Sequence, residues 1–169
     1  VISSRGQDEI YIIDHSTTTE EAAGHTGGNS GKGGDFLYRW GNPSKYDRGS
    51  TSSQKLFDQH GVNWIKEGYP GAGNLILYNN NYGNLSSAVF EISPPLDLDS
   101  INYVISDFEP FGPEEIEWMV TGGFHSNVQS GAFRLPNGNT LISVADDATI
   151  FEVDSSGNTV WDYEYPGVN

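Results

Sequence analysis

The chain has 169 residues, of which 36% are hydrophobic and 12% aromatic, so it is long enough for one ordinary domain with a lean core. Its net charge of −15 comes from 23 Asp and Glu against eight Lys and Arg, which argues against nucleic acid and anionic membrane surfaces as partners. The chain has no cysteine, which excludes disulfides and thiol chemistry, and no apolar run reaches membrane-spanning length. These properties fit a soluble protein that is secreted, periplasmic or extracellular.

The N-terminal part predicts a sheet that is interrupted by a glycine-rich insertion. Residues 1–14 predict two strands, residues 37–40 predict another, and the insertion at 15–33 lies between them, with one helical turn expected at 19–23. The insertion holds His15 and His25 among glycines that let backbone amides approach a ligand. It is either a ligand-binding loop or a solvated, mobile one. A short helix is expected near 53–57 in the polar stretch that follows.

The middle of the chain predicts a second group of strands. The group is expected to begin at 59–65, residues 70–77 echo the turn and strand at 136–142, and further strands follow at 89–92 and 116–118. An acidic, proline-rich excursion separates the last two. Asn84-Leu-Ser86 is an N-glycosylation sequon, which matters if a eukaryotic host secretes the protein.

The C-terminal part predicts four strands joined by tight turns rich in Gly, Asn and Asp. The strands are expected at 129–135, 139–145, 149–154 and 158–163. Because no turn exceeds a few residues, neighbouring strands should pair as an antiparallel meander.

The chain also repeats itself. Residues 1–14 align without gaps on 141–154, and residues 34–43 align on 157–166. A repeat of four short strands is typical of a β-propeller blade. We therefore predict an all-β fold, a β-propeller segment of about three four-stranded antiparallel blades in an incomplete ring; the alternative is a generic antiparallel sandwich. The expected blades are a partial blade 1 at 1–43, blade 2 at 59–120 and blade 3 at 125–166.

Closed propellers typically have four to eight blades, so three blades do not close a ring. We expect the ring to be completed by the remaining blades of a longer chain, or by self-association with other copies.

Two histidines stand at matching distances from a turn glycine. His60 lies 13 residues before Gly73, and His125 lies 13 residues before Gly138. This spacing predicts that both occupy the same position in consecutive blades, just before the innermost strand, and that both face a central channel. Imidazoles in such a place suit nucleophilic or general-base work, or anion binding when protonated. The alternative is a structural histidine bonded to a carbonyl of the neighbouring blade. No carboxylate lies beside them at ligand spacing, so no metal site is expected.

Several stretches resemble arylsulfotransferase-like proteins. The most specific are Arg39-Trp-Gly-Asn-Pro43 and Leu135-Pro-Asn-Gly-Asn-Thr-Leu-Ile142, and the resemblance covers nearly the whole chain. It implies a six-bladed periplasmic propeller that moves sulfuryl groups between phenols without a nucleotide donor. It also implies a channel histidine that is transiently sulfurylated, while other histidines and an arginine bind the sulfate.

Carried onto this sequence, the resemblance makes His60 and His125 the catalytic candidates, without deciding which is the nucleophile. It makes Arg134, His15 and His25 the candidates for substrate binding; Arg134 can equally point between blades. Aryl sulfates and phenols are the implied substrates, and no cofactor is expected. The alternative function is a non-catalytic extracellular module, structural or interacting, that assembles with other chains or blades.

Overall fold

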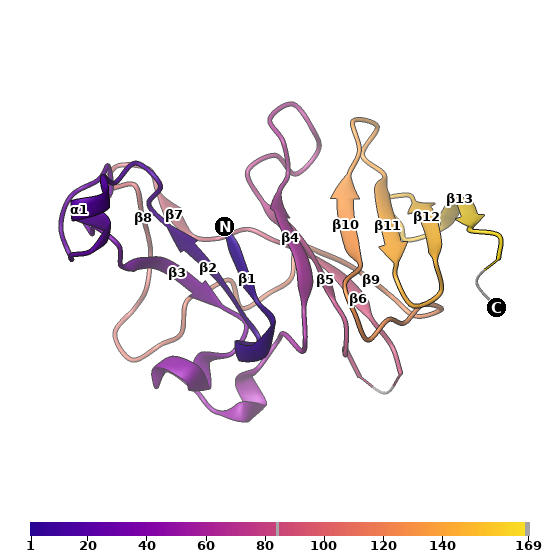
Figure 1. Ribbon diagram of the computed structural model, residues 1–169, viewed down its shortest axis with the longest axis horizontal. Coiled ribbons are helices and arrows are strands. Elements are labelled where there is room, and N and C mark those ends of the chain that lie inside the picture. The colour runs from indigo at the N-terminus through magenta and orange to yellow at the C-terminus, as the bar shows by residue number, and fades with distance from the viewer. Residues whose placement is uncertain (84, 168–169) are drawn as a thin grey trace. The chain divides into compact units, whose positions relative to one another are not determined.

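The computed structural model describes residues 1–83 and 85–167, which form mainly antiparallel β-strands and one short helix, α1 (Thr19–Ala22) (Figure 1). They divide into two compact units. The first comprises Val1–Lys55 and Pro94–Glu114, and the second comprises Leu56–Ser93 and Glu115–Asn169. The sheets of the described residues do not form a closed propeller.

The first unit contains a three-stranded sheet with the order β1-β2-β3 and a small hairpin. These strands are β1 (Ile2–Ser4), β2 (Glu9–Ile13), β3 (Phe36–Trp40), β7 (Leu96–Asp97) and β8 (Asn102–Tyr103). One face of the sheet is covered by the acidic excursion, because Tyr38 Oη donates to the Gly112 carbonyl at 2.7 Å and Trp40 Nε1 donates to the Pro113 carbonyl at 3.0 Å. The excursion is therefore part of the packing of this unit.

The second unit contains two four-stranded antiparallel sheets, with the orders β4-β5-β6-β9 and β10-β11-β12-β13. Their strands are β4 (His60–Trp64), β5 (Leu75–Asn79), β6 (Ala88–Ile92), β9 (Trp118–Thr121), β10 (Gly131–Arg134), β11 (Thr140–Val144), β12 (Thr149–Val153) and β13 (Thr159–Glu164). Every residue of β5 and β6 is buried, as expected for central strands covered on both faces, whereas every residue of β13 is exposed.

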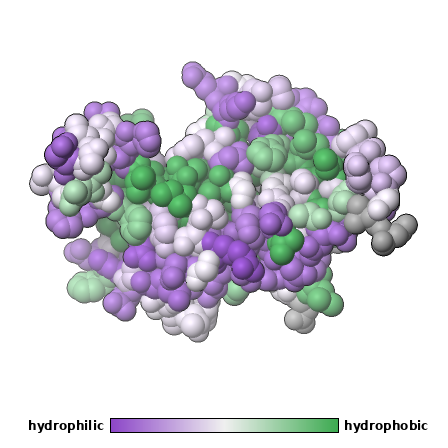
Figure 2. Space-filling view, in the orientation of Figure 1, coloured by the Kyte–Doolittle hydropathy of each residue, from purple (hydrophilic) through white to green (hydrophobic). Residues whose placement is uncertain are grey.

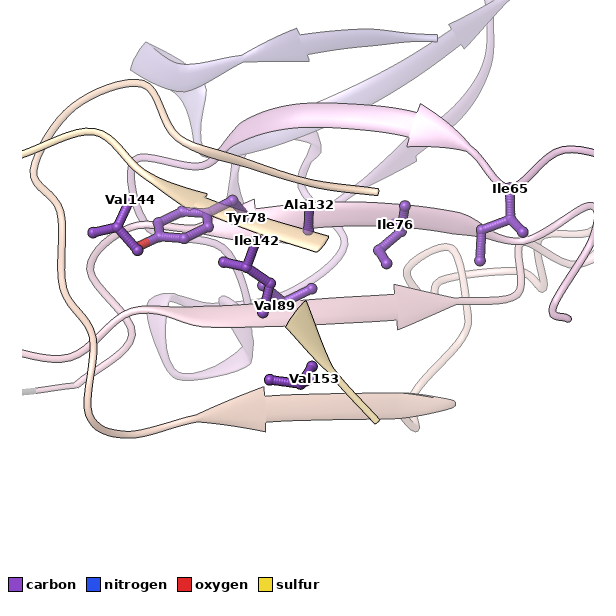
Figure 3. Close-up of a cluster of buried hydrophobic side chains, with 8 residues drawn as sticks. All are labelled: Ile65, Ile76, Tyr78, Val89, Ala132, Ile142, Val144 and Val153. Carbon is purple, nitrogen blue, oxygen red and sulfur yellow. The ribbon is translucent and has the colours of Figure 1, made fainter. Parts of the chain in front are cut away.

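The core of the second unit lies between its two sheets. Side chains from β5, β6, β10, β11 and β12 meet there, as Figure 3 shows. The cluster consists of Ile65, Ile76, Tyr78, Val89, Ala132, Ile142, Val144 and Val153. Asn63 Nδ2 donates to the Ala132 carbonyl at 3.0 Å, which ties β4 to β10 beside this core.

The sequence repeat is also a structural repeat. Shifted by 140 residues, β2 coincides with β12, and the pair Ile2–Tyr11 becomes the pair Ile142–Phe151. Shifted by 123 residues, β3 lies on β13. The β2–β3 and β12–β13 ladders also have a register shift at equivalent positions, after Ile12 and after Glu152. The two sheets therefore share register as well as sequence.

Two local expectations were wrong. The short helix expected near 53–57 is absent; instead two 3-10 helices occupy Pro43–Tyr46 and Thr51–Ser53, and Gln54 is already extended. Pro43 starts the first of them, since its fixed φ suits a first helical position. The fourth strand of the β4-β5-β6-β9 sheet begins at Trp118, whereas the sequence pattern placed it at 116–118.

Within the described part of the chain, no helix has the length and apolar character needed to cross a bilayer.

Candidate functional site

His60 lies on β4, where it pairs with Tyr78 of β5. Its imidazole is half-buried, and Nδ1 is 2.8 Å from Oδ1 of Asn80, a fully buried side chain just after β5. This contact fixes the ring at the end of two neighbouring strands.

The Asn80 carboxamide determines which nitrogen of His60 carries the proton. Asn80 Nδ2 donates to the Ser126 carbonyl at 2.9 Å and to the Gln129 carbonyl at 3.2 Å, so both of its hydrogens are used. The oxygen of a carboxamide only accepts, so Nδ1 of His60 must be the donor. In neutral His60 the lone pair is then on Nε2, which is the form that a nucleophile or general base requires.

His125 joins the same group through Ser87. Ser87 Oγ donates its single hydrogen to the Asn80 carbonyl at 2.6 Å and accepts from the Ser126 amide at 3.1 Å. His125 Nδ1 lies 3.5 Å from that oxygen, a long contact in which the imidazole is the donor. We call His60, Asn80, Ser87, His125 and Ser126 the histidine network.

The loop that leads into β10 supports this network with strained backbone. Gln129 and Ser130 have φ angles of 36° and 73°, in a region that residues other than glycine rarely adopt. The Gln129 carbonyl is one of the two acceptors for Asn80. Non-glycine residues in such conformations are enriched at functional sites, which supports the histidine network as a candidate site.

Asp146 adds a carboxylate close to His125. Hydrogen bonds from the Asn127 amide and side chain, at 2.7 and 3.1 Å, hold the pKa of Asp146 below its ordinary value, and the charge of His125 adds to this effect.

The two histidines are not equivalent positions of the repeat. His60 pairs with Tyr78 as Gly131 pairs with Ser143, so Gly131 takes the place that corresponds to His60. The equal spacing from Gly73 and Gly138 was misleading because the connection from β4 to β5, residues 65–74, is longer than that from β10 to β11, residues 135–139. The histidines instead meet through the hydrogen bonds of Asn80 and Ser87.

Arg134 belongs to a different set of contacts. It lies at the far end of β10 from Gly131, and its guanidinium pairs with the Glu91 carboxylate, donates to the Gly138 carbonyl at 2.9 Å and stacks 4.9 Å from the Trp118 ring. The structure does not bring it into the histidine network. Arg134 instead points toward the neighbouring sheet, where Glu91 lies on β6.

His15 and His25 lie in the first unit, outside the histidine network. His15 is exposed, and His25 Nδ1 pairs with Asp35 at 2.7 Å although the His25 side chain is 86% exposed. Asn84, the expected glycosylation position, lies outside the described residues.

Backbone amides of the glycine-rich insertion donate hydrogen bonds to the carboxylates of Asp14 and Glu21. Asp14 accepts from the Ser16 and Ser30 amides at 2.9 and 2.8 Å, and Glu21 accepts from the Gly28 amide at 3.3 Å while closing a capping box with Thr18. These bonds, with the Ser16 hydroxyl foremost, hold the pKa of Asp14 well below its ordinary value. The Ser16, Gly28 and Ser30 amides are thus already bonded to protein oxygens, and a ligand-binding role for the loop stays a prediction.

Asn80, Ser87 and Ser126 were missed by the sequence analysis. The one available signal was their position: Asn80 directly follows the apolar strand β5, and Ser87 directly precedes β6. All three are fully buried, and buried polar groups of this kind must be hydrogen-bonded.

Comparisons of the chain with models of known protein families, with curated proteins and with solved structures found no match.

Proposed function

We propose that the chain is a β-propeller segment that transfers sulfuryl groups between phenolic compounds, with His60 as the nucleophile. The observation that carries this proposal is the bond from His60 Nδ1 to Asn80 Oδ1, which leaves Nε2 with its lone pair. The sequence resemblance to arylsulfotransferase-like proteins supplies the group that is transferred.

In the first step, Nε2 of His60 attacks the sulfur of an aryl sulfate. The N–S bond forms, the S–O bond to the aryl group breaks, and the phenolate leaves with both electrons of that bond. His125 acts as the general acid and gives the leaving oxygen its proton.

In the second step, the oxygen of an acceptor phenol attacks the same sulfur and loses its proton to His125. The S–O bond forms and the N–S bond breaks, which returns His60 to its starting form. Asn80 supports the cationic imidazole formed in between, because its Oδ1 remains an acceptor for Nδ1–H.

The first prediction tests this chemistry with 4-nitrophenyl sulfate as donor and phenol as acceptor. We expect the wild-type chain to release 4-nitrophenol, and His60→Asn to lose at least about 1,000-fold in rate, since a covalent path has no substitute nucleophile. His125→Asn should lose about 100-fold, the usual size of a general acid–base contribution. Release is followed by absorbance, and folding is checked by circular dichroism.

His25→Asn is the matched control, because His25 is exposed and lies in the other unit. Its rate should equal that of the wild type. A wild-type chain that is inert, or a His60→Asn variant with wild-type rates, would contradict the proposal.

A second function is favoured by a separate observation: the chain is an interaction module that assembles with a second copy of itself. Trp161 and Tyr163 on β13 are 48% and 45% exposed, yet the residues at the same repeat positions, Tyr38 and Trp40, are 0% and 2% exposed. Because the two sheets share register, this face of β11–β13 has the composition of a face that is covered in the first unit.

A further inference from the structure

A small pocket lies in the second unit, at the ends of β4 and β10 away from the histidine network. Its volume is about 220 Å³, and it is open to solvent. The lining residues are Asn63, Trp64, Ile65, Lys66, Tyr69, Phe133, Arg134, Leu135 and Pro136. Figure 2 shows hydrophobic surface over β10, one of the two strands that line the pocket.

The walls of the pocket are aromatic and accessible. Trp64 is 39% exposed and Phe133 is 50% exposed, although each stands on a strand whose neighbours are well packed. Tyr69, half-buried, supplies a third ring. Aromatic surface of this kind favours a flat apolar partner, because stacked or edge-to-face contacts between rings add to the gain from burial. A cavity of about 150 Å³ already takes a benzene ring.

Arg134, which lines the pocket, also carries a hydrogen-bond donor that is unpaired within the described part of the chain. Arg134 is buried, with 5% of its side chain exposed, and its two terminal nitrogens serve Glu91 and Gly138. Its Nε is buried and has no partner among the described residues. A buried N–H without an acceptor is costly, so a ligand acceptor placed here would stabilise the site.

The charge at the pocket is positive in an acidic chain. Glu91 neutralises Arg134, whereas Lys66 is exposed and makes no ion pair with a described residue. The lining contains no carboxylate. Lys66 is therefore the one charge of the lining without a partner among residues 1–83 and 85–167, and locally it favours a single negative charge.

We infer that this pocket binds a small planar aromatic monoanion. The anion accepts hydrogen bonds from Arg134 Nε and Lys66 Nζ, and the ring lies against Trp64, Phe133 and Tyr69. The inference is independent of the proposed transfer reaction, because it uses none of the residues of the histidine network.

The test is binding of benzoate to the full chain, measured by saturation-transfer NMR and calorimetry. For a ligand of this size we expect a dissociation constant on the order of 1 mM. Benzamide, which has the ring without the charge, and cyclohexanecarboxylate, which has the charge without the aromatic ring, should each bind at least about tenfold more weakly.

Two variants locate the site. Lys66→Met and Trp64→Leu should each weaken benzoate binding by about tenfold or more, whereas Lys45→Met and Trp161→Leu, which change an exposed lysine and an exposed tryptophan outside the lining, should leave it unchanged. All four variants keep Arg134 and Glu91, so the packing of the strands is preserved. Equal binding of benzoate and benzamide, equal loss in the control variants, or no binding at tens of millimolar would each overturn the inference.

Discussion

At the scale of single residues, the orientation of one buried carboxamide determines the chemistry of the candidate site. Asn80 directs both Nδ2 hydrogens to backbone carbonyls, so its oxygen faces His60. The backbone carbonyl of the same residue accepts from Ser87 Oγ, which also contacts His125 Nδ1. Asn80 therefore links two histidines that lie 65 positions apart in the chain, through its side chain on one side and its backbone carbonyl on the other.

The second prediction concerns the tautomer of His60. In the neutral ring the proton should reside on Nδ1, because Asn80 Oδ1 can only accept. Nitrogen-15 NMR with long-range proton correlation distinguishes the two tautomers directly, and exposed His15 provides the reference in the same spectrum. A His60 ring protonated on Nε2 when neutral would refute the assignment of the nucleophilic atom.

At the scale of elements, the pair Arg134–Glu91 joins the β10-β11-β12-β13 sheet to the β4-β5-β6-β9 sheet. Both side chains are nearly buried, with 5% and 9% exposed, and Glu91 also accepts from Asn74 at 2.7 Å. The pair thus connects β10, β6 and the turn before β5.

The third prediction follows from that burial. Glu91→Gln should lower the free energy of unfolding by about 3 kcal/mol, because it leaves a buried guanidinium without its carboxylate. The exposed pair Lys55–Glu114 provides the control: Glu114, 82% exposed, changed to Gln should cost less than about 1 kcal/mol. Urea denaturation measures the free energy of unfolding of both variants. Equal decreases would show that the buried pair stabilises the fold no more than the exposed pair does.

Most strand positions and their antiparallel pairing could be predicted from the sequence because the repeat preserves alternation and turn chemistry together. The alignment of 1–14 on 141–154 located β2 and β12 residue for residue. The prediction that His60 and His125 are equivalent was wrong, because the connection after β4 is longer than the one after β10 and the spacing to the turn glycines does not show this. Asn80 and Ser87 were equally hidden, because their importance comes from hydrogen bonds between segments far apart in sequence.

At the scale of the whole molecule, the exposed face of β11–β13 predicts assembly. The fourth prediction is that the chain associates with a second copy through this face, since the exposed aromatic surface of Trp161 and Tyr163 is unfavourable in water. Changing both residues to Ser should convert the assembly to monomers, as measured by light scattering. Phe108→Ser, at a position 88% exposed in the first unit, is the control and should change nothing. A wild-type chain that is a monodisperse monomer with a cooperative melt would contradict this prediction.

The most direct test of the central claim is to trap the covalent intermediate. The chain is mixed with 4-nitrophenyl sulfate in the absence of an acceptor phenol, quenched under alkaline conditions, digested and examined by mass spectrometry. We expect one added SO₃ group on the peptide that contains His60, and none on that peptide in His60→Asn. A sulfuryl group found on His125 instead, or turnover without any modified histidine, would contradict it.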